Sequence, residues 1–354
     1  MIGLGIMSGS SLDGLDIALV EFDFDSKNQW QLLHGHTFPL DPQLISKLKS
    51  AVHTDPFEYA EIEFGYSKFV VACILEFRSQ CGSEDEFIAL HGHTVLHLPK
   101  YAKSVQMINA AYVAEQCQRR TITDFRNNDL ALGGQGTPMA VLADKYLFPG
   151  YDYYLNLGGI ANISFQNEKW QAFDLFPFNQ VLNHFANKLG QEYDQDGVLA
   201  SEGKTDLTIL QKLNSHPYVL LDPPKSLDNT EVKKTWIHWM DQLDVDVPSL
   251  LTTFIEFSCF QLDKTVQSNS RIMLTGGGTK NTYFIQCLEN ILSRKSVNLE
   301  IPSDSIIDFK EAILMAFAGA LRLNNQTNFI SDATGAKRDA FGGAVYLPST
   351  YGEH

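Results

Sequence analysis

The sequence predicts an α/β protein built from two similar domains that face one shared cleft, and two observations support this prediction. A pattern of strand, small-residue turn and two further strands opens the chain, and it returns about 150 residues later at Tyr153. Helical and strand patterns alternate after each copy. Two such copies would direct two glycine-containing turns towards the same cleft.

The first copy occupies the N-terminal residues. Residues 2–7 (IGLGIM) form an apolar strand, and the small polar segment Ser8–Ser11 turns the chain. Residues 14–23 return as a second strand, and residues 30–38 supply a third after a polar turn. Three consecutive strands with short connections predict an antiparallel meander.

Alternating helices and strands follow this meander. Apolar positions at helical spacing predict a helix over residues 57–79, and residues 86–92 form the next strand. Further elements are a helix near 107–119, a strand at 121–125 and a helix near 138–147. The last of these begins well, since Thr137 is an N-cap residue and Pro138 occupies the first helical position.

The second copy begins at residue 153. YYLNLGG (153–159) is an apolar strand that ends in glycines, and residues 160–166 and 170–176 form the second and third strands. We therefore divide the chain into domains at 1–144 and 145–354. The remaining elements predicted in the second domain are helices at 180–189, 248–267 and 310–323 and a strand at 271–275 that runs into Gly276–Gly278.

Composition narrows the class of protein. The chain has 44% hydrophobic and 19% charged residues, which is ordinary for a soluble globular enzyme. A net charge of −15 argues against a nucleic-acid partner. Five scattered cysteines without a C-x-x-C pair, no signal-peptide pattern and no long apolar run favour a cytoplasmic protein without membrane partners.

Three glycine-containing segments are candidate ligand-binding turns. The hairpin at 7–16 (MSGSSLDGLD) offers hydroxyls and backbone N–H groups to an anion, with Asp13 and Asp16 near for a metal ion or water. The hairpin at 156–162 lets the backbone approach a ligand, and Gly276–Gly278 between a strand and a helix suits the adenosine end of a nucleotide. Each segment alone is also compatible with an ordinary turn.

Polar segments in the first domain are candidates for a second ligand. Arg126, in the segment DFRNNDLALGGQGTP (124–138), could pair with a carboxylate or phosphate, or form a structural pair with an aspartate of its own loop. His91, His93 and His97 lie at even spacing and would share one face of a strand. Without an accompanying carboxylate or cysteine at ligand spacing, they favour a sugar-binding or core role over a metal site.

These segments together resemble one family, the anhydro-N-acetylmuramic acid kinases of the hexokinase–actin superfamily. The resemblance extends over nearly the whole chain and implies two duplicated actin-like (ribonuclease H-like) domains with a nucleotide cleft between them. The matching segments are GIMSGSSLDGLD (5–16), HGHTVLHLP (91–99), DFRNNDLALGGQGTP (124–138), NLGGIANIS (156–164), YDQDG (193–197), GGGTKN (276–281), KEAILMAFAGAL (310–321) and TGA (334–336).

The resemblance implies a reaction between ATP, water and 1,6-anhydro-N-acetylmuramic acid. A carboxylate activates water for attack at the anomeric carbon, the ring opens, and O6 takes the γ-phosphoryl group to give N-acetylmuramic acid 6-phosphate. Phosphoryl transfer depends otherwise on positioning and on Mg²⁺. The implied partner is therefore a small amino sugar, and a homodimer stays open.

The resemblance also assigns roles to residues. The two hairpins hold the phosphates, Gly276–Gly278 lies by the adenosine, and Asp13 is a candidate metal ligand. The phosphate-binding residues are Gly9, Ser10, Ser11, Leu12, Asp13, Gly14, Leu15, Asp16, Gly158 and Gly159, and the sugar-binding residues are His91, Arg126, Asp129, Gln135 and Glu311.

The chain departs from the family at the catalytic base. The family pattern Asp-x-Gly-Pro-Gly-Asn-x-Leu-x-Asp reads here from Asp174 to Asn183, so that Phe176 and Phe178 replace two glycines and Asn183 replaces the aspartate that activates water. An amide cannot accept that proton usefully near neutral pH.

Three interpretations follow from this departure. The chain is a working kinase of the family that uses another aspartate, such as Asp174, Asp194 or Asp196. Alternatively, it is a kinase for an amino sugar with a free hydroxyl, with Asp174 as the base. The third interpretation is a catalytically inactive relative that binds nucleotide or sugar.

Overall fold

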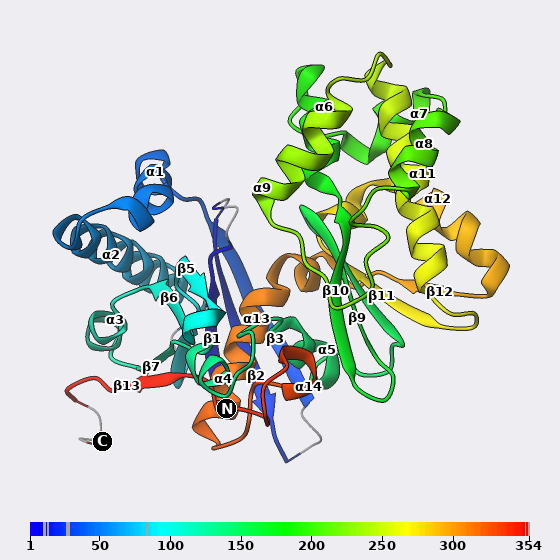
Figure 1. The fold of residues 1–354 in the computed structure, drawn as a ribbon. Coiled ribbons are helices and arrows are strands. Elements are labelled where there is room, and N and C mark those ends of the chain that lie inside the picture. Colours follow the sequence, from blue (N-terminus) through cyan, green and yellow to red (C-terminus); the bar gives the residue numbers. More distant parts are fainter. Residues whose placement is uncertain (10–11, 13, 26–28, 83, 351, 353–354) are drawn as a thin grey trace. The chain divides into compact units, whose positions relative to one another are not determined.

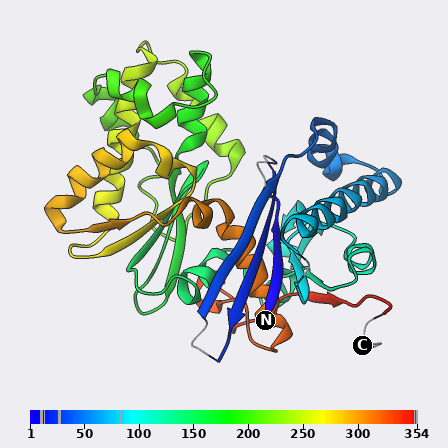
Figure 2. The same ribbon diagram turned by 180° about the vertical axis from the view of Figure 1, so that it is seen from behind.

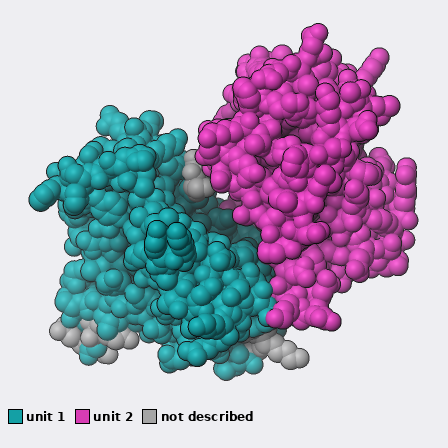
Figure 3. Space-filling model, viewed as in Figure 1, with its two compact units in different colours: residues 1–149, 309–354 teal, residues 150–308 magenta. Residues whose placement is uncertain are grey.

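The computed structural model describes residues 1–9, 12, 14–25, 29–82, 84–350 and 352, which form two compact units (Figures 1 and 3). Unit 1 contains residues 1–149 and 309–354, and unit 2 contains residues 150–308. The predicted ranges, 1–144 and 145–354, differ from these units in one main respect, because the chain returns to unit 1 after residue 308.

A six-stranded sheet forms the centre of unit 1. Its strand order is β13-β7-β4-β1-β2-β3, with β1, β2 and β3 antiparallel and with β4 and β7 parallel to β1. Figure 2 shows the three antiparallel strands side by side in blue. The strands are β1 (Ile2–Met7), β2 (Leu15–Asp23), β3 (Gln29–Phe38), β4 (Phe87–Leu90), β7 (Arg120–Thr123) and β13 (Ala344–Tyr346).

Helices cover both faces of this sheet (Figures 1 and 2). The side chains of Leu4 and Ile6 on β1 pack in the apolar cluster with α2. Because successive residues of a strand face opposite sides of the sheet, Gly5 lies on the other face. A short hairpin of β5 and β6 completes the unit. The remaining elements are α1 (Pro42–Ser50), α2 (Pro56–Cys81), β5 (His93–Leu98), β6 (Lys103–Met107), α3 (Ala110–Cys117), α4 (Asn127–Ala131), α5 (Ala140–Tyr146), α13 (Asp304–Leu323) and α14 (Ser331–Thr334). Residues 304–308, at the start of α13, belong to unit 2.

Helix α13 explains why the C-terminal residues belong to unit 1. A Cβ on Gly5 would overlap the carbonyl oxygen of Ala312, and a Cβ on Gly319 would meet Ala89 of β4. The helix therefore approaches the sheet so closely that only glycine fits at these points. Beyond it, β13 pairs with the edge strand β7.

Unit 2 has a five-stranded sheet in the order β10-β9-β8-β11-β12, with β8, β9 and β10 antiparallel and β11 parallel to β8. Its core gathers aromatic residues of α6, α11 and α12. The elements are β8 (Tyr153–Leu157), β9 (Ile160–Gln166), β10 (Trp170–Pro177), α6 (Asn179–Lys188), α7 (Val198–Glu202), α8 (Leu207–Asn214), α9 (Asn229–Glu231), α10 (His238–Met240), α11 (Val247–Thr265), β11 (Arg271–Thr275), α12 (Thr282–Leu292) and β12 (Asn298–Glu300).

The two sheets share one topology, which confirms the internal repeat predicted from the sequence. In each sheet, the three strands of an antiparallel meander lie side by side in reverse chain order. Next to the first strand of the meander lie two strands that run parallel to it. These are β4 and β7 in unit 1, and β11 and β12 in unit 2. The predicted α/β fold with two duplicated domains is therefore confirmed. Within the ranges given above, no helix combines the length and apolar character needed to cross a bilayer.

Candidate functional site

The first candidate turn joins β1 to β2 in unit 1. Ser10, Ser11 and Asp13 lie outside the described residues, so the structure gives no account of the predicted metal ligand Asp13. Leu12 has a positive φ of 58°, its N–H donates to the carbonyl of Gly9 at 3.1 Å, and its side chain is buried. Leu12 could therefore contact a ligand only through its backbone.

The return strand of this turn is fixed by a contact with β3. Asp16 accepts a hydrogen bond from the hydroxyl of Thr37 at 2.6 Å, and Leu15 is buried in the core. A Cβ on Gly14 would lie 2.5 Å from the methyl group of Thr37. Thr37, which sequence reasoning missed, therefore sets the position of both Gly14 and Asp16.

The second candidate turn, Gly158–Gly159, is bound to the start of α6 in unit 2. The carbonyl of Gly159 accepts hydrogen bonds from the N–H groups of Phe178 (2.8 Å) and Gln180 (3.2 Å), and the carbonyl of Gly158 accepts one from Asn179 (3.1 Å). The turn thus satisfies N–H groups that the first turn of a helix would otherwise leave without partners.

The third glycine segment lies directly beside the second. Strand β11 runs parallel to β8, with Thr275 opposite Asn156. The next residues of the two strands, Gly276 and Leu157, therefore lie beside each other. Gly276 has a φ of 87°, and a Cβ on it would lie 2.8 Å from the carbonyl oxygen of Leu157. Two of the three predicted nucleotide-binding segments therefore meet within one unit.

Two glycines in these segments are not required by the fold. Neither Gly158 nor Gly277 has a positive φ, and a Cβ on them would find its nearest atoms at 3.4 Å and 3.9 Å. Gly276 and Gly278, in contrast, have no room for a Cβ. The absence of a side chain at Gly158 and Gly277 therefore leaves backbone open to an approaching group.

Asn183, which the family resemblance assigns to the position of the catalytic base, lies on α6 one turn beyond these contacts. It is partly buried, and its backbone carbonyl accepts a hydrogen bond from Asn187 at 2.6 Å. Asp174, the predicted alternative base, is on β10. Its carboxylate accepts a hydrogen bond from the N–H of Leu227 at 2.8 Å, and burial raises its pKa although that bond opposes the effect.

Asp194 and Asp196, the other candidate bases, both have partners in the protein. The carboxylate of Asp194 is buried and accepts hydrogen bonds from the N–H groups of Leu199 and Ala200, at 2.8 and 3.0 Å. Asp196 accepts one from the hydroxyl of Thr282 at 2.9 Å. Asp194 therefore binds two N–H groups in the first turn of α7, and Asp196 joins the loop before α7 to α12.

The two phenylalanines that replace the family's glycines are core residues. Phe176 and Phe178 are fully buried, and their rings pack against Phe257 (centroids 5.6 Å apart) and Phe284 (4.7 Å) respectively. A Cβ on Gly278 would lie 2.5 Å from the Phe178 ring. The Phe178 ring thus supports the glycine segment from the core side.

The predicted sugar-binding residues of unit 1 include His91, which is buried, and Arg126, which is partly buried and close enough to affect its charge. Burial and the neighbouring Arg126 lower the pKa of His91 to about 3, so its imidazole is neutral at neutral pH. Burial also lowers the pKa of Arg126 to about 10, while Glu311 opposes the change. Within the described residues, neither Nε2 of His91 nor Nε of Arg126 has a hydrogen-bond partner.

Two other histidines lie near this pair. Positive charge on His93 or His97 would oppose protonation of His91. His97 bonds through Nδ1 to the hydroxyl of Ser104 at 3.0 Å. A bulge in β5 between Thr94 and Leu96 interrupts the alternation on which a shared strand face depends, and no group of histidine, cysteine and acidic side chains that would hold a metal exists in the described parts of the chain.

Asp129 organises the loop that carries Gln135. Its buried carboxylate accepts hydrogen bonds from the N–H of Gly136 and the hydroxyl of Thr334, both at 2.7 Å. The N–H of Gln135 donates to the carbonyl of Thr334 at 2.9 Å, and the Gln135 side chain is exposed. The segments 124–138 and 334–336 are thereby joined, although Thr334 was recognised only as part of a matching motif.

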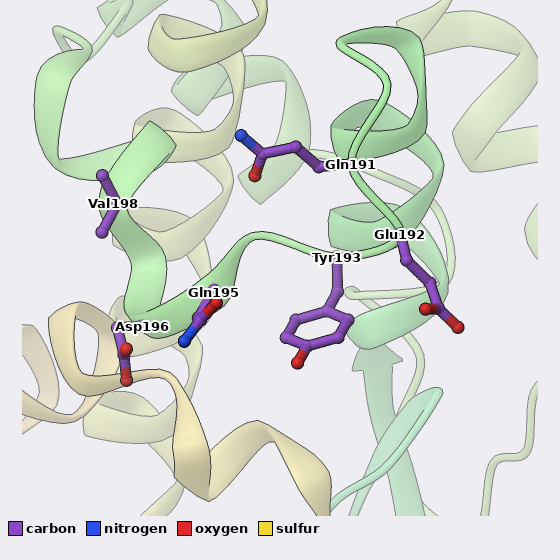
Figure 4. Close-up of a pocket in the computed structure, with 6 residues that line it drawn as sticks. All are labelled: Gln191, Glu192, Tyr193, Gln195, Asp196 and Val198. Carbon is purple, nitrogen blue, oxygen red and sulfur yellow. The ribbon is translucent and has the colours of Figure 1, made fainter.

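A surface pocket of about 520 Å³ lies at the segment YDQDG (Figure 4). Gly197 has no room for a Cβ because Asn281 and Tyr283 lie against it. The pocket therefore adjoins the end of the glycine segment 276–281. Its lining residues are Gln191, Glu192, Tyr193, Gln195, Asp196 and Val198.

Comparison with known proteins gives a consistent result. A family profile described as anhydro-N-acetylmuramic acid kinase matches residues 1–348. The anhydro-N-acetylmuramic acid kinase of Pseudomonas savastanoi pv. phaseolicola is 30% identical over 361 residues, covering 97% of this chain and 98% of the relative. That of Pasteurella multocida is 30% identical over 367 residues, covering 98% and 97%.

Similarity to solved structures is weaker. The activator of the 2-hydroxyisocaproyl-CoA dehydratase from Clostridium difficile, solved with bound ADPNP, aligns with a TM-score of 0.45 at 10% sequence identity. The alignment covers 92% of this chain and 97% of that one, a likeness too low to bear on function.

Proposed function

We propose that this chain, which belongs to the anhydro-N-acetylmuramic acid kinase family, converts 1,6-anhydro-N-acetylmuramic acid to N-acetylmuramic acid 6-phosphate with ATP. The observation that carries the proposal is the meeting of Gly158–Gly159 and Gly276–Gly278 at Leu157, with room left open at Gly158 and Gly277. Such exposed backbone suits the phosphates of a nucleotide.

The glycine segments of unit 2 fit ATP, and the family resemblance implies Mg²⁺ with it. ATP supplies the phosphoryl group. Gly158, Gly159 and Gly276–Gly278 would hold the nucleotide in unit 2. Mg²⁺ keeps several waters and needs only one or two carboxylates. Asp13, the candidate ligand that the resemblance gives, lies outside the described residues.

In unit 1, His91 and Arg126 would bind the sugar. Arg126 keeps its charge at neutral pH and has a buried Nε without a partner, which suits the carboxylate of the sugar's lactyl group. His91 is neutral and would exchange a hydrogen bond with a sugar hydroxyl through Nε2. Glu311 and the loop at Gln135 would complete this side.

Asn183 limits the hydrolytic half of the reaction. In that half, a water oxygen bonds to the anomeric carbon, the bond from that carbon to O6 breaks, and a base takes a proton from the water. The amide of Asn183 cannot take it. We therefore propose slow turnover of the anhydro sugar by the native sequence.

Asn183 also motivates a second candidate function. A kinase for an amino sugar that already has a free hydroxyl needs no water activation, and a nucleotide- and sugar-binding protein without turnover needs no base at all. Asp174 is a weaker base candidate than its sequence position indicates, because its carboxylate already anchors Leu227.

Calorimetric titration with Mg–ATP tests the nucleotide half of this proposal. We expect Gly158→Ala and Gly277→Ala to weaken binding by about tenfold or more without unfolding the protein, since both positions have room for a methyl group. Gly65→Ala, in the middle of α2 with open space around it, is the matched control. A native protein that gives no heat at millimolar nucleotide would contradict the proposal.

A further inference from the structure

One amide side chain lies where the two glycine segments of unit 2 meet. Nδ2 of Asn179 donates to the carbonyl of Leu157 at 3.0 Å. The same nitrogen would be 3.9 Å from a Cβ on Gly277, the nearest atom to that position. Asn179 is only partly buried.

The carbonyl of Leu157 is the point that both segments share. It precedes Gly158, and it would lie 2.8 Å from a Cβ on Gly276 and 3.0 Å from one on Gly278. The hydrogen bond from Asn179 therefore holds the carbonyl oxygen of Leu157, which lies between the Gly158 turn and the segment Gly276–Gly278.

Other hydrogen bonds of this region do not involve the Asn179 side chain and would survive its replacement. The N–H groups of Phe178, Asn179 and Gln180 bind the carbonyls of Gly158 and Gly159 whatever residues stand there. A further side-chain donor, the hydroxyl of Thr279, binds the carbonyl of Gly276 at 2.7 Å. The bond to the carbonyl of Leu157 is the one that depends on the Asn179 side chain. Because glycines have no side chains to anchor them, hydrogen bonds to the backbone are what hold such a turn in one conformation.

We propose that Asn179 is a positioning residue for the nucleotide, which fixes the Gly158 turn and the segment Gly276–Gly278 in the arrangement that binds phosphate and adenosine. This inference rests on the proposed function, since it supposes that the two segments hold a nucleotide. It predicts that nucleotide affinity depends on the Asn179 amide more than stability does.

Calorimetric titration of the full chain with Mg–ADP tests the inference. Asn179→Ala removes the donor, and Asn179→Asp keeps the size of the side chain while removing the donor at neutral pH. Both variants are expected to bind Mg–ADP about three- to tenfold more weakly, the effect of losing one hydrogen bond. Asn290→Ala, which changes an exposed asparagine of α12 in the same unit, should bind like the native chain.

A second measurement separates positioning from a structural role. If Asn179 positions the nucleotide, the variants unfold within a few degrees of the native chain and the KM for the sugar stays unchanged while the KM for ATP rises. Unchanged Mg–ADP affinity in folded Asn179→Ala overturns the inference and leaves the proposed function intact. Loss of folding in both variants also overturns it, whereas a native chain that binds no nucleotide refutes the proposed function itself.

Discussion

At the scale of single residues, our proposal makes the amide of Asn183 the limit on the turnover of an anhydro sugar. Restoring the carboxylate with Asn183→Asp should raise kcat for 1,6-anhydro-N-acetylmuramic acid by about 10²–10⁴, the usual contribution of a general base. Steady-state kinetics with Asn290→Asp as the charge-matched control on exposed α12 measures this. If kcat does not increase, water activation does not limit the native chain.

A second residue-scale prediction concerns His91 and pH. Its pKa is about 3 in the folded protein because of burial and Arg126, whereas an unfolded histidine titrates near about 6.5. Between these values the unfolded chain binds a proton that the folded chain does not, so stability falls as pH drops below about 6.5.

Replacing His91 removes this dependence. As the pH falls from 6 to 4, the free energy of unfolding of the native chain should decrease more steeply than that of His91→Gln. The difference between the two slopes should be about 1.4 kcal/mol per pH unit. Denaturant titrations at several pH values measure the two slopes, and the remaining histidines are the same in both proteins. Equal slopes would show that His91 is not held neutral.

At the scale of elements, the packing of α13 on β1 can be tested with one methyl group. Gly5→Ala places a Cβ into the carbonyl of Ala312, so it should destabilise unit 1 by about 3 kcal/mol or more. Gly65→Ala makes the same change in α2, where no atom lies within 4 Å, and should stabilise the chain by about 0.5–1 kcal/mol. If thermal unfolding shows that both substitutions change the stability in the same direction, this packing is contradicted.

The aromatic packing under the glycine segment gives a second prediction for elements. Phe178→Ala should cost about 3–5 kcal/mol, because the ring is fully buried against Phe284 and its loss leaves a cavity. Phe260→Ala on α11 removes a ring that is 41% exposed and should cost less than about 1 kcal/mol. Equal losses in denaturant titrations would show that Phe178 is not a core residue.

Sequence patterns predicted some elements better than others. The two meanders and α2 were evident from alternating and helical apolar spacing. The hairpin of β5 and β6 was not, because its half-buried residues and the bulge after Thr94 leave no regular alternation. The inward packing of Phe176 and Phe178 was also missed, since substitution of glycine by phenylalanine does not reveal which way the ring points.

At the scale of the whole molecule, the duplicated topology was predictable because both copies repeat the same order of strands and glycine turns. The return of the chain to unit 1 was not, since it depends on the close fit of α13 to Gly5 and Gly319 rather than on any local pattern. The site was predictable as segments from the family resemblance. Contacts such as Asn179 with Leu157 and Thr334 with Asp129 join distant parts of the chain, and they emerge only from the fold.

The whole-molecule charge also bears on function. A net charge of −15 repels ATP at long range. In our proposal, binding therefore comes from local backbone N–H groups and a metal ion, which act at short range and are little affected by that field. This is the reason that single methyl groups at Gly158 and Gly277 are expected to matter.

One measurement tests the central claim most directly: release of ADP from Mg–ATP with 1,6-anhydro-N-acetylmuramic acid, with free amino sugars and with no sugar, by the native chain and by Asn183→Asp. Sugar-dependent ADP release, fastest for the anhydro sugar with Asn183→Asp and accompanied by a 6-phosphorylated product, is the predicted result. If neither protein releases ADP above the no-sugar rate with any sugar, although both bind nucleotide, the assignment as a kinase is contradicted.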